Sequence, residues 1–148
     1  VVQEPREGSG HALWVARELY RHSPDGILIV LGDSIVDTDL DAIVRAEDSV
    51  LAVKPVKIPA DFGVVEVDAN GYATRAVEKP RIPKSNYAMV GVYKITSPER
   101  LIAALDSLIA ENARAANNEF YLTDALERMI RQGERFTVRP VDHWFDCG

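Results

Sequence analysis

Acidic side chains follow apolar runs of the sequence, in places where they could do chemistry. Asp33 follows the run Ile27–Leu31 after Gly32, and Asp146 lies among aromatic residues near the end of the chain. In open α/β sheets, ligands bind at the carboxyl ends of the strands. A carboxylate placed there could hold Mg²⁺, a hard cation that takes oxygen ligands. Taken alone, each aspartate also suits an ordinary loop.

The segment Glu78-Lys79-Pro80 combines an acid and a base after another β-rich run. At a ligand crevice the Lys79 ammonium would bind a phosphate, and the Glu78 carboxylate would accept hydrogen bonds from sugar hydroxyls. The alternative is a solvated charge pair before a proline turn.

The segment Gly8-Ser9-Gly10 precedes a predicted helix, and its backbone amides could approach a base or a phosphate closely. It lacks the Lys-Ser/Thr pair of a P-loop. Other chemically active residue types give weaker signals. The three histidines have no metal-ligand spacing, and Cys147 has no identifiable base partner, so we expect structural roles for them.

The hydrophobic pattern predicts strands that alternate with helices. Strands are expected at Ile27–Leu31, Val50–Val53, Tyr87–Ile95 and Phe136–Val141, with a hairpin of Gly63–Val67 and Ala73–Val77 around Asn70-Gly71. Helices are expected at Ser9–His22, at Asp37–Asp48, after Ser97-Pro98 with Leu101, Leu105 and Leu108 on the apolar face, and at Leu122–Gln132.

This alternation predicts an α/β fold, a Rossmann-like three-layer sandwich with a mostly parallel mixed sheet and an inserted β-hairpin. The run Ile27–Leu31 is apolar on both faces. We therefore expect it to form a central strand that helices cover on both sides.

Composition narrows the class of protein. The chain has 148 residues, with 17 Lys and Arg against 23 Asp and Glu. The acidic balance argues against a nucleic-acid binder. No apolar run is long enough to span a bilayer, and no signal-peptide pattern is present. A single cysteine excludes an intrachain disulfide framework. We expect a cytoplasmic protein, and a start at Val1 without Met indicates part of a longer chain.

Several segments, taken in order, resemble the sugar-phosphate nucleotidyltransferases, also called nucleotide-sugar pyrophosphorylases, and most of all the glucose-1-phosphate thymidylyltransferases. The matching segments are Gln3–Leu13, Leu31-Gly32-Asp33, Phe62–Val65, Glu78-Lys79-Pro80, Ser85–Tyr93, Leu122-Thr123-Asp124 and Trp144–Gly148. The resemblance runs from end to end of the chain, so it implies one domain of the nucleotide-diphospho-sugar transferase type over residues 1–148.

The resemblance implies a reaction. A sugar-1-phosphate, with glucose-1-phosphate favoured, attacks the α-phosphorus of a nucleoside triphosphate, with dTTP or UTP favoured, and pyrophosphate leaves. Catalysis is then mostly positioning and charge neutralisation. Asp33, Lys79 and Asp146 match the catalytic positions, and both aspartates match the magnesium ligands. Two carboxylates about 4 Å apart repel by about 4 kcal/mol at an effective dielectric constant of 20, which favours a shared cation.

The resemblance also implies the remaining binding positions. The positions that bind the nucleotide are Gln3, Gly8 and Leu31, and those that bind the sugar phosphate are Gly63, Glu78, Lys79, Met89 and Tyr93. Gln3 and Gly8 match the positions that contact a pyrimidine base.

The sequence also departs from the family pattern. The family's N-terminal strand and its Gly-Gly-x-Gly-x-Arg loop are absent, so we expect a partial catalytic domain, and whether these residues are active alone stays open. A non-catalytic nucleotide-sugar-binding or regulatory module is the alternative. A nicotinamide-dependent oxidoreductase is disfavoured, because no G-x-G-x-x-G follows a strand. Uridine, thymidine and guanosine nucleotides, the sugar, and homo-oligomerisation stay open.

Overall fold

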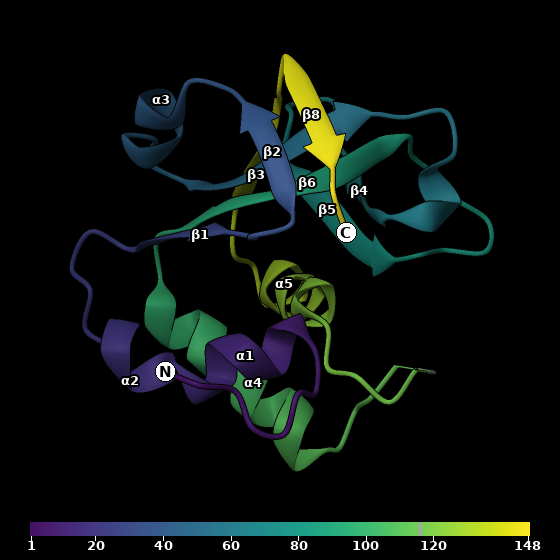
Figure 1. Ribbon diagram of the computed structural model, residues 1–148. Coiled ribbons are helices and arrows are strands. Elements are labelled where there is room, and N and C mark those ends of the chain that lie inside the picture. The colour runs from purple at the N-terminus through teal and green to yellow at the C-terminus, as the bar shows by residue number, and fades with distance from the viewer. Residues whose placement is uncertain (116) are drawn as a thin grey trace.

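The computed structural model describes residues 1–115 and 117–148 and has a six-stranded sheet at its centre. The strands are β1 (Ile27–Val30), β3 (Ser49–Pro55), β4 (Gly63–Val67), β5 (Ala73–Glu78), β6 (Tyr87–Ile95) and β7 (Phe136–Pro140). Their order is β5-β4-β6-β3-β7, and β1 pairs with β6 on the side away from β3. The long strand β6 is therefore the centre of the sheet (Figure 1).

The sheet is mixed, as predicted, but its paired strands are mostly antiparallel. Strands β1, β3 and β4 all pair antiparallel with β6, and β4 pairs antiparallel with β5. Among the described residues of this sheet only β3 and β7 form a parallel pair. Strands β1, β3, β4 and β7 share one direction, but β6 runs between them in the opposite one. The predicted predominance of parallel pairing is wrong for this reason.

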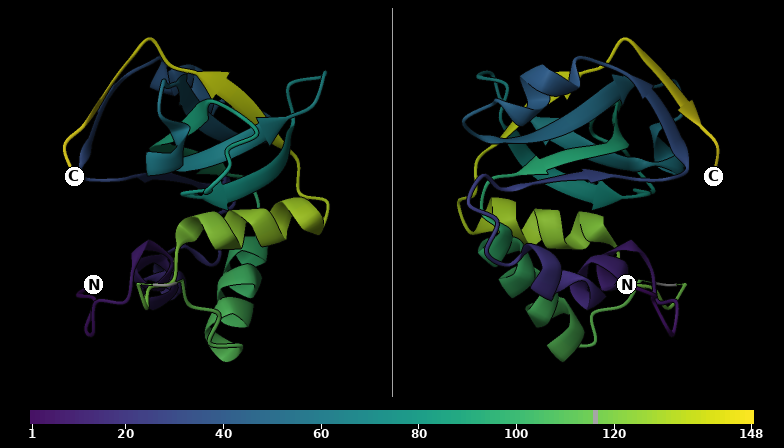
Figure 2. Two further views of the ribbon diagram at one scale, coloured as in Figure 1. Left: turned by 90° about the vertical axis from the view of Figure 1, so that its right-hand side faces the viewer. Right: turned by 60° about the vertical axis from the view of Figure 1, so that its left-hand side comes forward.

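One face of the sheet is covered by helices α1 (Ser9–Val15), α4 (Pro98–Ala110) and α5 (Leu122–Arg131) (Figures 1 and 2). The main core lies in this layer. The predicted apolar face of α4 is buried there through Leu101, Leu105 and Leu108. Side chains of a strand alternate between its faces, so Leu51 and Val53 of β3 enter this core while their neighbours point the other way.

The opposite face carries the third layer, a short helix α3 (Leu40–Val44) and a ribbon of β2 (Ser34–Asp37) and β8 (His143–Asp146). Figure 1 shows this ribbon crossing over the sheet. Ile43 of α3 packs with Val50, Ala52, Val90 and Val92 into a second, smaller core. The three-layer α/β sandwich is thus confirmed.

The inserted hairpin of β4 and β5 is also confirmed. Its turn is closed by Asp68, whose carboxylate accepts the backbone N–H groups of Asn70 at 2.8 Å and Tyr72 at 2.9 Å. Gly71 has φ of +86°, a conformation that glycine adopts at low cost. The turn residues therefore fix the register that places Gly63 opposite Glu78.

Three predicted elements differ from the structure. The expected helix Ser9–His22 is divided at Ala16 into α1 and a short α2 (Arg17–Tyr20). The expected helix Asp37–Asp48 is shortened to α3, because β2 pairs with β8 up to Asp37. The strand Ile27–Leu31 is not covered on both faces, since Val30 is 55% exposed.

No helix in the described part of the chain is both long and apolar enough to cross a membrane. A short 3₁₀ turn, η1 (Pro59–Asp61), leads into β4 and completes the set of elements around the site.

Candidate active site

A cavity of about 480 Å³ opens beside the ends of β1 and β5 and beneath the β2–β8 ribbon. All of the site residues predicted from the sequence except Gln3 line it. These are Gly8, Leu31, Asp33, Gly63, Glu78, Lys79, Met89, Tyr93 and Asp146. The structure thus brings together residues that lie far apart in the sequence, while their individual roles stay predictions.

The ribbon brings Asp33 and Asp146 together. Ser34 of β2 is paired with Asp146 of β8, and the Cys147 N–H donates to the Asp33 carbonyl at 2.8 Å. A Cβ placed on Gly148 would lie 3.0 Å from Asp33 Oδ2 and 3.5 Å from Asp146 Oδ1. The two carboxylates therefore face the same point, although they lie far apart in the sequence.

This pair suits Mg²⁺ better than a metal with an all-protein ligand set. Among residues 1–115 and 117–148, no three His, Cys, Asp or Glu side chains form a group that could hold a metal ion. Mg²⁺ is usually held by one or two carboxylates together with substrate phosphates and water. Asp33 and Asp146 supply two carboxylates at the wall of an open cavity, where substrate phosphates and water could complete the coordination.

Glu78 is fixed by a short hydrogen bond. The Thr123 hydroxyl, at the start of α5, donates to Glu78 Oε2 at 2.6 Å. A Cβ placed on Gly63, the strand partner of Glu78, would lie 2.8 Å from that same oxygen and 2.9 Å from Met89 Cε. Gly63 therefore leaves the space next to a carboxylate that is held in one orientation.

Lys79 has an uncommon backbone conformation, with φ of +39°. Its N–H donates to the Phe62 carbonyl at 3.0 Å, which holds the end of β5 against the start of β4. Within the described residues its ammonium has no carboxylate within ion-pair distance. A left-handed conformation in a non-glycine residue costs free energy, so the surrounding structure imposes this placement of the cation.

Leu31 and Tyr93 form the apolar floor of the cavity. The N–H of Leu31 donates to the Gly91 carbonyl at 2.9 Å, and a Cβ on Gly91 would lie 3.1 Å from the Leu31 side chain. Gly91 therefore permits this close approach. Burial raises the pKa of the Tyr93 phenol, and the negative charges of Glu78 and Asp33 raise it further, so Tyr93 is neutral.

Gly8 in the loop before α1 and Ser9 at the start of that helix form one wall. Phe120 holds this loop in place, because its N–H donates to the Glu7 carbonyl and its own carbonyl accepts the Gly10 N–H, both at 2.8 Å. Gly8 has φ of +97°, and a Cβ there would lie 2.6 Å from Phe120 O. The prediction that the amides of this loop approach a base or a phosphate is wrong for Gly10, whose amide is already bonded.

Gln3 lies behind this wall and does not line the cavity. Its amide nitrogen donates to the Gly8 carbonyl at 3.0 Å and lies 3.0 Å from His11 Nδ1. Both partners contact the nitrogen of the Gln3 amide. The predicted contact between Gln3 and a base would therefore have to use the amide oxygen.

Thr123 and Trp144 line the cavity but carry no predicted role. Trp144 packs edge-on against Phe62, with ring centroids 5.0 Å apart, and its Nε1 is buried without a hydrogen-bond partner in the described structure. Both residues lie in segments that carry the family resemblance. The contacts across the fold that give them a place in the cavity are not visible in the sequence.

A second cavity of about 620 Å³ adjoins the first and shares Glu78, Lys79 and Tyr121 with it. Its arginines already have carboxylate partners, since Arg75 and Arg131 both contact Glu127. We therefore place the candidate active site in the cavity that contains Asp33 and Asp146.

Comparison with known proteins identifies the family of the chain. The family profile described as "Nucleotidyl transferase" matches residues 1–148. The "Bifunctional protein GlmU" of Methanococcus maripaludis is 30% identical over 150 residues, which cover 100% of this chain and 34% of the relative. The "Low-salt glycan biosynthesis nucleotidyltransferase Agl11" of Haloferax volcanii is 27% identical and covers 98% of this chain and 40% of the relative. The chain thus spans about a third of the length of the first curated relatives.

A solved structure from Bacillus anthracis has a similar fold. It is described as a candidate glucose-1-phosphate thymidylyltransferase in complex with a sucrose, and it superposes with a TM-score of 0.76 at 27% identity. The match covers 99% of this chain and 58% of that one. The α/β fold is therefore shared over nearly the whole chain.

Proposed function

Because the chain belongs to the nucleotidyl transferase family, we propose that it forms the substrate-binding part of a sugar-1-phosphate nucleotidyltransferase. The observation that carries the proposal is the cavity itself, whose lining combines the carboxylates of Asp33 and Asp146 with the Glu78–Lys79 pair. Such a lining offers ligands for a phosphate-bound cation, an ammonium for a phosphate and an acceptor for sugar hydroxyls. The alternative is a module that binds nucleotide sugars without catalysis.

In the proposed reaction a phosphate oxygen of the sugar-1-phosphate attacks the α-phosphorus of the nucleoside triphosphate. A P–O bond forms to the sugar phosphate, and the bond to pyrophosphate breaks. No covalent intermediate with the protein is needed, so the protein contributes orientation and compensation of charge. Asp33 and Asp146 would hold Mg²⁺, which when bound would offset the negative charge of the phosphates.

Other residues of the cavity would bind the remaining parts of the two substrates. The Lys79 ammonium would bind the phosphate of the sugar-1-phosphate as a point charge. Glu78, held by Thr123, would accept hydrogen bonds from sugar hydroxyls, and Gly63 would let the sugar ring approach. Leu31 would pack against the nucleoside.

We propose dTTP or UTP as the nucleotide and glucose-1-phosphate as the favoured sugar phosphate. Support for the base comes from Gln3. Among the described residues Gly8 and His11 contact its amide nitrogen, which leaves the amide oxygen to accept the N–H of a uracil-type base. Support for the sugar comes from the solved structure described as a candidate glucose-1-phosphate thymidylyltransferase. Thymine differs from uracil by one methyl group, worth only about 1–3 kcal/mol in a pocket.

Pyrophosphate release tests the proposal. The 148-residue chain is incubated with Mg²⁺ and each of dTTP, UTP, GTP and CTP, in combination with glucose-1-phosphate, N-acetylglucosamine-1-phosphate or mannose-1-phosphate. We expect release with dTTP or UTP, and a loss of about 100-fold or more in Asp33→Asn. Asp37→Asn, at the far end of β2 and paired opposite His143, is the matched control and should retain the rate.

Nucleotide binding is measured in parallel by calorimetry. Binding of UTP or a UDP-sugar without turnover in any combination would favour the non-catalytic module. The absence of both binding and turnover would contradict the proposed function altogether.

A further inference from the structure

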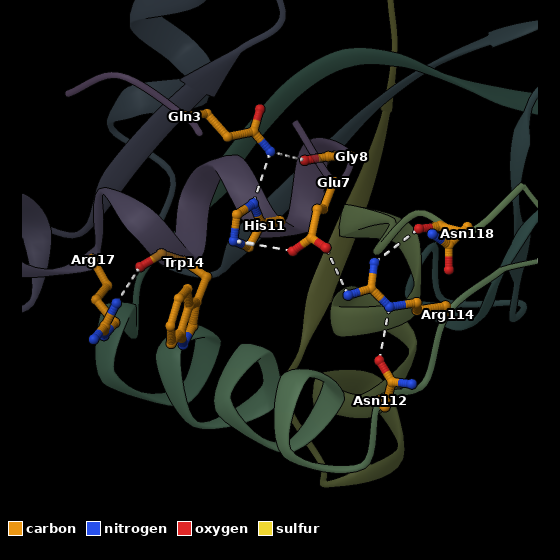
Figure 3. Close-up of polar contacts among 9 residues, drawn as sticks. All are labelled: Gln3, Glu7, Gly8, His11, Trp14, Arg17, Asn112, Arg114 and Asn118. Atoms are coloured by element: carbon orange, nitrogen blue, oxygen red, sulfur yellow. Dashed lines mark hydrogen bonds and ion pairs between the residues drawn. The ribbon is translucent and has the colours of Figure 1, made fainter. Parts of the chain in front are cut away.

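The strongest unexplained feature next to the cavity is a chain of polar contacts that ends on Gln3 (Figure 3). Gln3 Nε2 lies 3.0 Å from the Gly8 carbonyl oxygen and 3.0 Å from His11 Nδ1. His11 Nε2 lies 3.5 Å from Glu7 Oε2, and the other oxygen of Glu7 accepts from Arg114 at 2.7 Å. The sequence alone suggested only a structural role for His11.

The Gly8 carbonyl determines how the Gln3 amide must be oriented. A carbonyl oxygen can only accept, so the amide group that faces it must be the NH₂ and not the oxygen. The second amide proton then points at His11 Nδ1, which must be an unprotonated acceptor. The proton of a neutral imidazole is consequently on Nε2, on the side of the Glu7 carboxylate.

The surroundings of His11 keep its ring in this orientation. The residue is only 6% exposed. The Trp14 ring stacks on the imidazole, with centroids 5.7 Å apart and an interplanar angle of 22°. The Phe120 ring is tilted against the imidazole, with centroids 6.5 Å apart. Arg114 packs over the Phe120 ring at 4.2 Å while it holds Glu7. Rotating the imidazole would thus break two polar contacts in a packed space.

We propose that His11 is a positioning residue that fixes the amide of Gln3 and thereby sets the preference of the site for uracil or thymine over cytosine. The inference rests on the proposed function, because it assumes that Gln3 reads the base. Both amide protons of Gln3 are used by Gly8 and His11, and Figure 3 shows the amide oxygen pointing away from both. The open side of Gln3 is therefore a pure acceptor.

An acceptor at this position discriminates between pyrimidines. Uracil and thymine carry an N3–H that can donate to it. Cytosine has an unprotonated N3, which would place two lone pairs against each other. Without His11, the amide keeps only its bond to Gly8 and can pivot about it. The amide oxygen is then held less precisely, and the selectivity of the site decreases.

The first test needs no nucleotide. In ¹⁵N-labelled protein at pH 8, the ring-nitrogen shifts of His11 distinguish the two neutral tautomers. We expect Nε2–H, with Nδ1 as the acceptor. Observation of the Nδ1–H tautomer would overturn the proposal, whatever the protein binds.

The second test measures the binding of UTP and CTP with Mg²⁺ by calorimetry, in a double-mutant cycle of His11→Phe and Gln3→Ala. Phenylalanine retains an aromatic ring against Trp14 but offers no acceptor. We expect each single change to reduce the UTP-over-CTP preference about tenfold, and the double change to reduce it no further than Gln3→Ala alone. Independent, multiplicative effects would mean that His11 acts only on the fold, and would overturn the proposal.

Two further variants separate positioning from packing. His11→Asn restores an oxygen acceptor near the Nδ1 position and should recover most of the preference. His22→Phe makes the same substitution at an exposed histidine outside this network and should leave the preference intact. A loss in His22→Phe equal to that in His11→Phe would contradict the role of the hydrogen bond. If the wild type binds neither nucleotide, the proposed function and the base preference fail together, while the tautomer measurement still decides whether His11 holds Gln3.

Discussion

Gly63 leaves a space that a single methyl group would fill. A Cβ there would lie 2.8 Å from Glu78 Oε2, 2.9 Å from Met89 Cε and 3.1 Å from Thr123 Oγ1. Contacts under 3 Å force neighbours to move, and Glu78 is already bonded to Thr123. The methyl group would therefore shift the carboxylate and occupy the room next to it.

For Gly63→Ala we predict a weaker affinity for the sugar-1-phosphate by about tenfold to 100-fold, because overpacking costs about 1–3 kcal/mol. Nucleotide affinity should change less. Isothermal titration with each substrate checks this. The matched control is Gly32→Ala, since a Cβ at Gly32 meets nothing within 4 Å. Equal effects of the two variants would show that Gly63 is not a wall of the sugar site.

For single residues, the sequence predicted which side chains line the cavity, but not which contacts fix them in place. Asp33 and Lys79 follow strands and carry the residue types that the chemistry needs, so their places were predictable. The bond from Thr123 to Glu78 joins α5 to β5, and the sequence contains no sign of that contact. Gln3 was singled out as a base contact, yet the structure places it behind Gly8, outside the cavity lining.

Helices α4 and α5 are joined by a polar cluster at their exposed ends. Hydrogen bonds from Arg128 and Ser107 lower the pKa of the Glu111 carboxyl from its ordinary value of 4.5 to about 2. A group whose pKa is lower in the folded state stabilises the fold above its unfolded pKa and loses this effect as the pH falls. The contribution of Glu111 is therefore present at pH 7 and disappears between about pH 4.5 and 2.

For Glu111→Gln we predict a small decrease in melting temperature at pH 7 that shrinks as the pH falls toward 2. Thermal melts followed by circular dichroism at several pH values measure it. Glu47→Gln removes an exposed carboxylate that has no ion pair within the described chain, and it serves as the control. A difference between Glu111→Gln and wild type that persists unchanged at pH 2 would argue against this linkage.

The β2–β8 ribbon is the element that the sequence predicted least well. Ser34-Ile35-Val36-Asp37 is a short alternating stretch beside a helical pattern, and its strand partner lies at the other end of the chain. Local periodicity cannot identify such a partner. In contrast, Tyr87–Ile95 was predicted with its correct bounds, because a long, almost uninterrupted apolar run needs no knowledge of its neighbours.

At the scale of the whole molecule, the strand β1 lies at an edge of the described sheet. Among the described residues β1 pairs only with β6, and its Leu28 and Val30 side chains are 39% and 55% exposed. An exposed apolar edge strand is a template for pairing with another chain. The sequence could show that Ile27–Leu31 is apolar, but not that one face lacks a cover.

We predict that the 148-residue chain associates as its concentration rises, and that Val30→Lys keeps it monomeric, because a charge on an edge strand blocks pairing. Sedimentation velocity at several concentrations checks this. Ile82→Lys removes an 84% exposed hydrophobic side chain from a loop outside the sheet and should associate as the wild type does. Unchanged association of Val30→Lys would exclude β1 as the contact.

The short segment from Phe120 to Thr123 makes the two halves of the cavity mechanically dependent on each other. At one end Phe120 is bonded to Glu7 and Gly10 in the loop next to Gln3, and at the other end Thr123 is bonded to Glu78. We therefore expect a ligand that rigidifies one half to lower the entropy that the other half still has to lose. The second substrate to arrive would meet a site that the first has already ordered, so the two affinities should rise together and not independently.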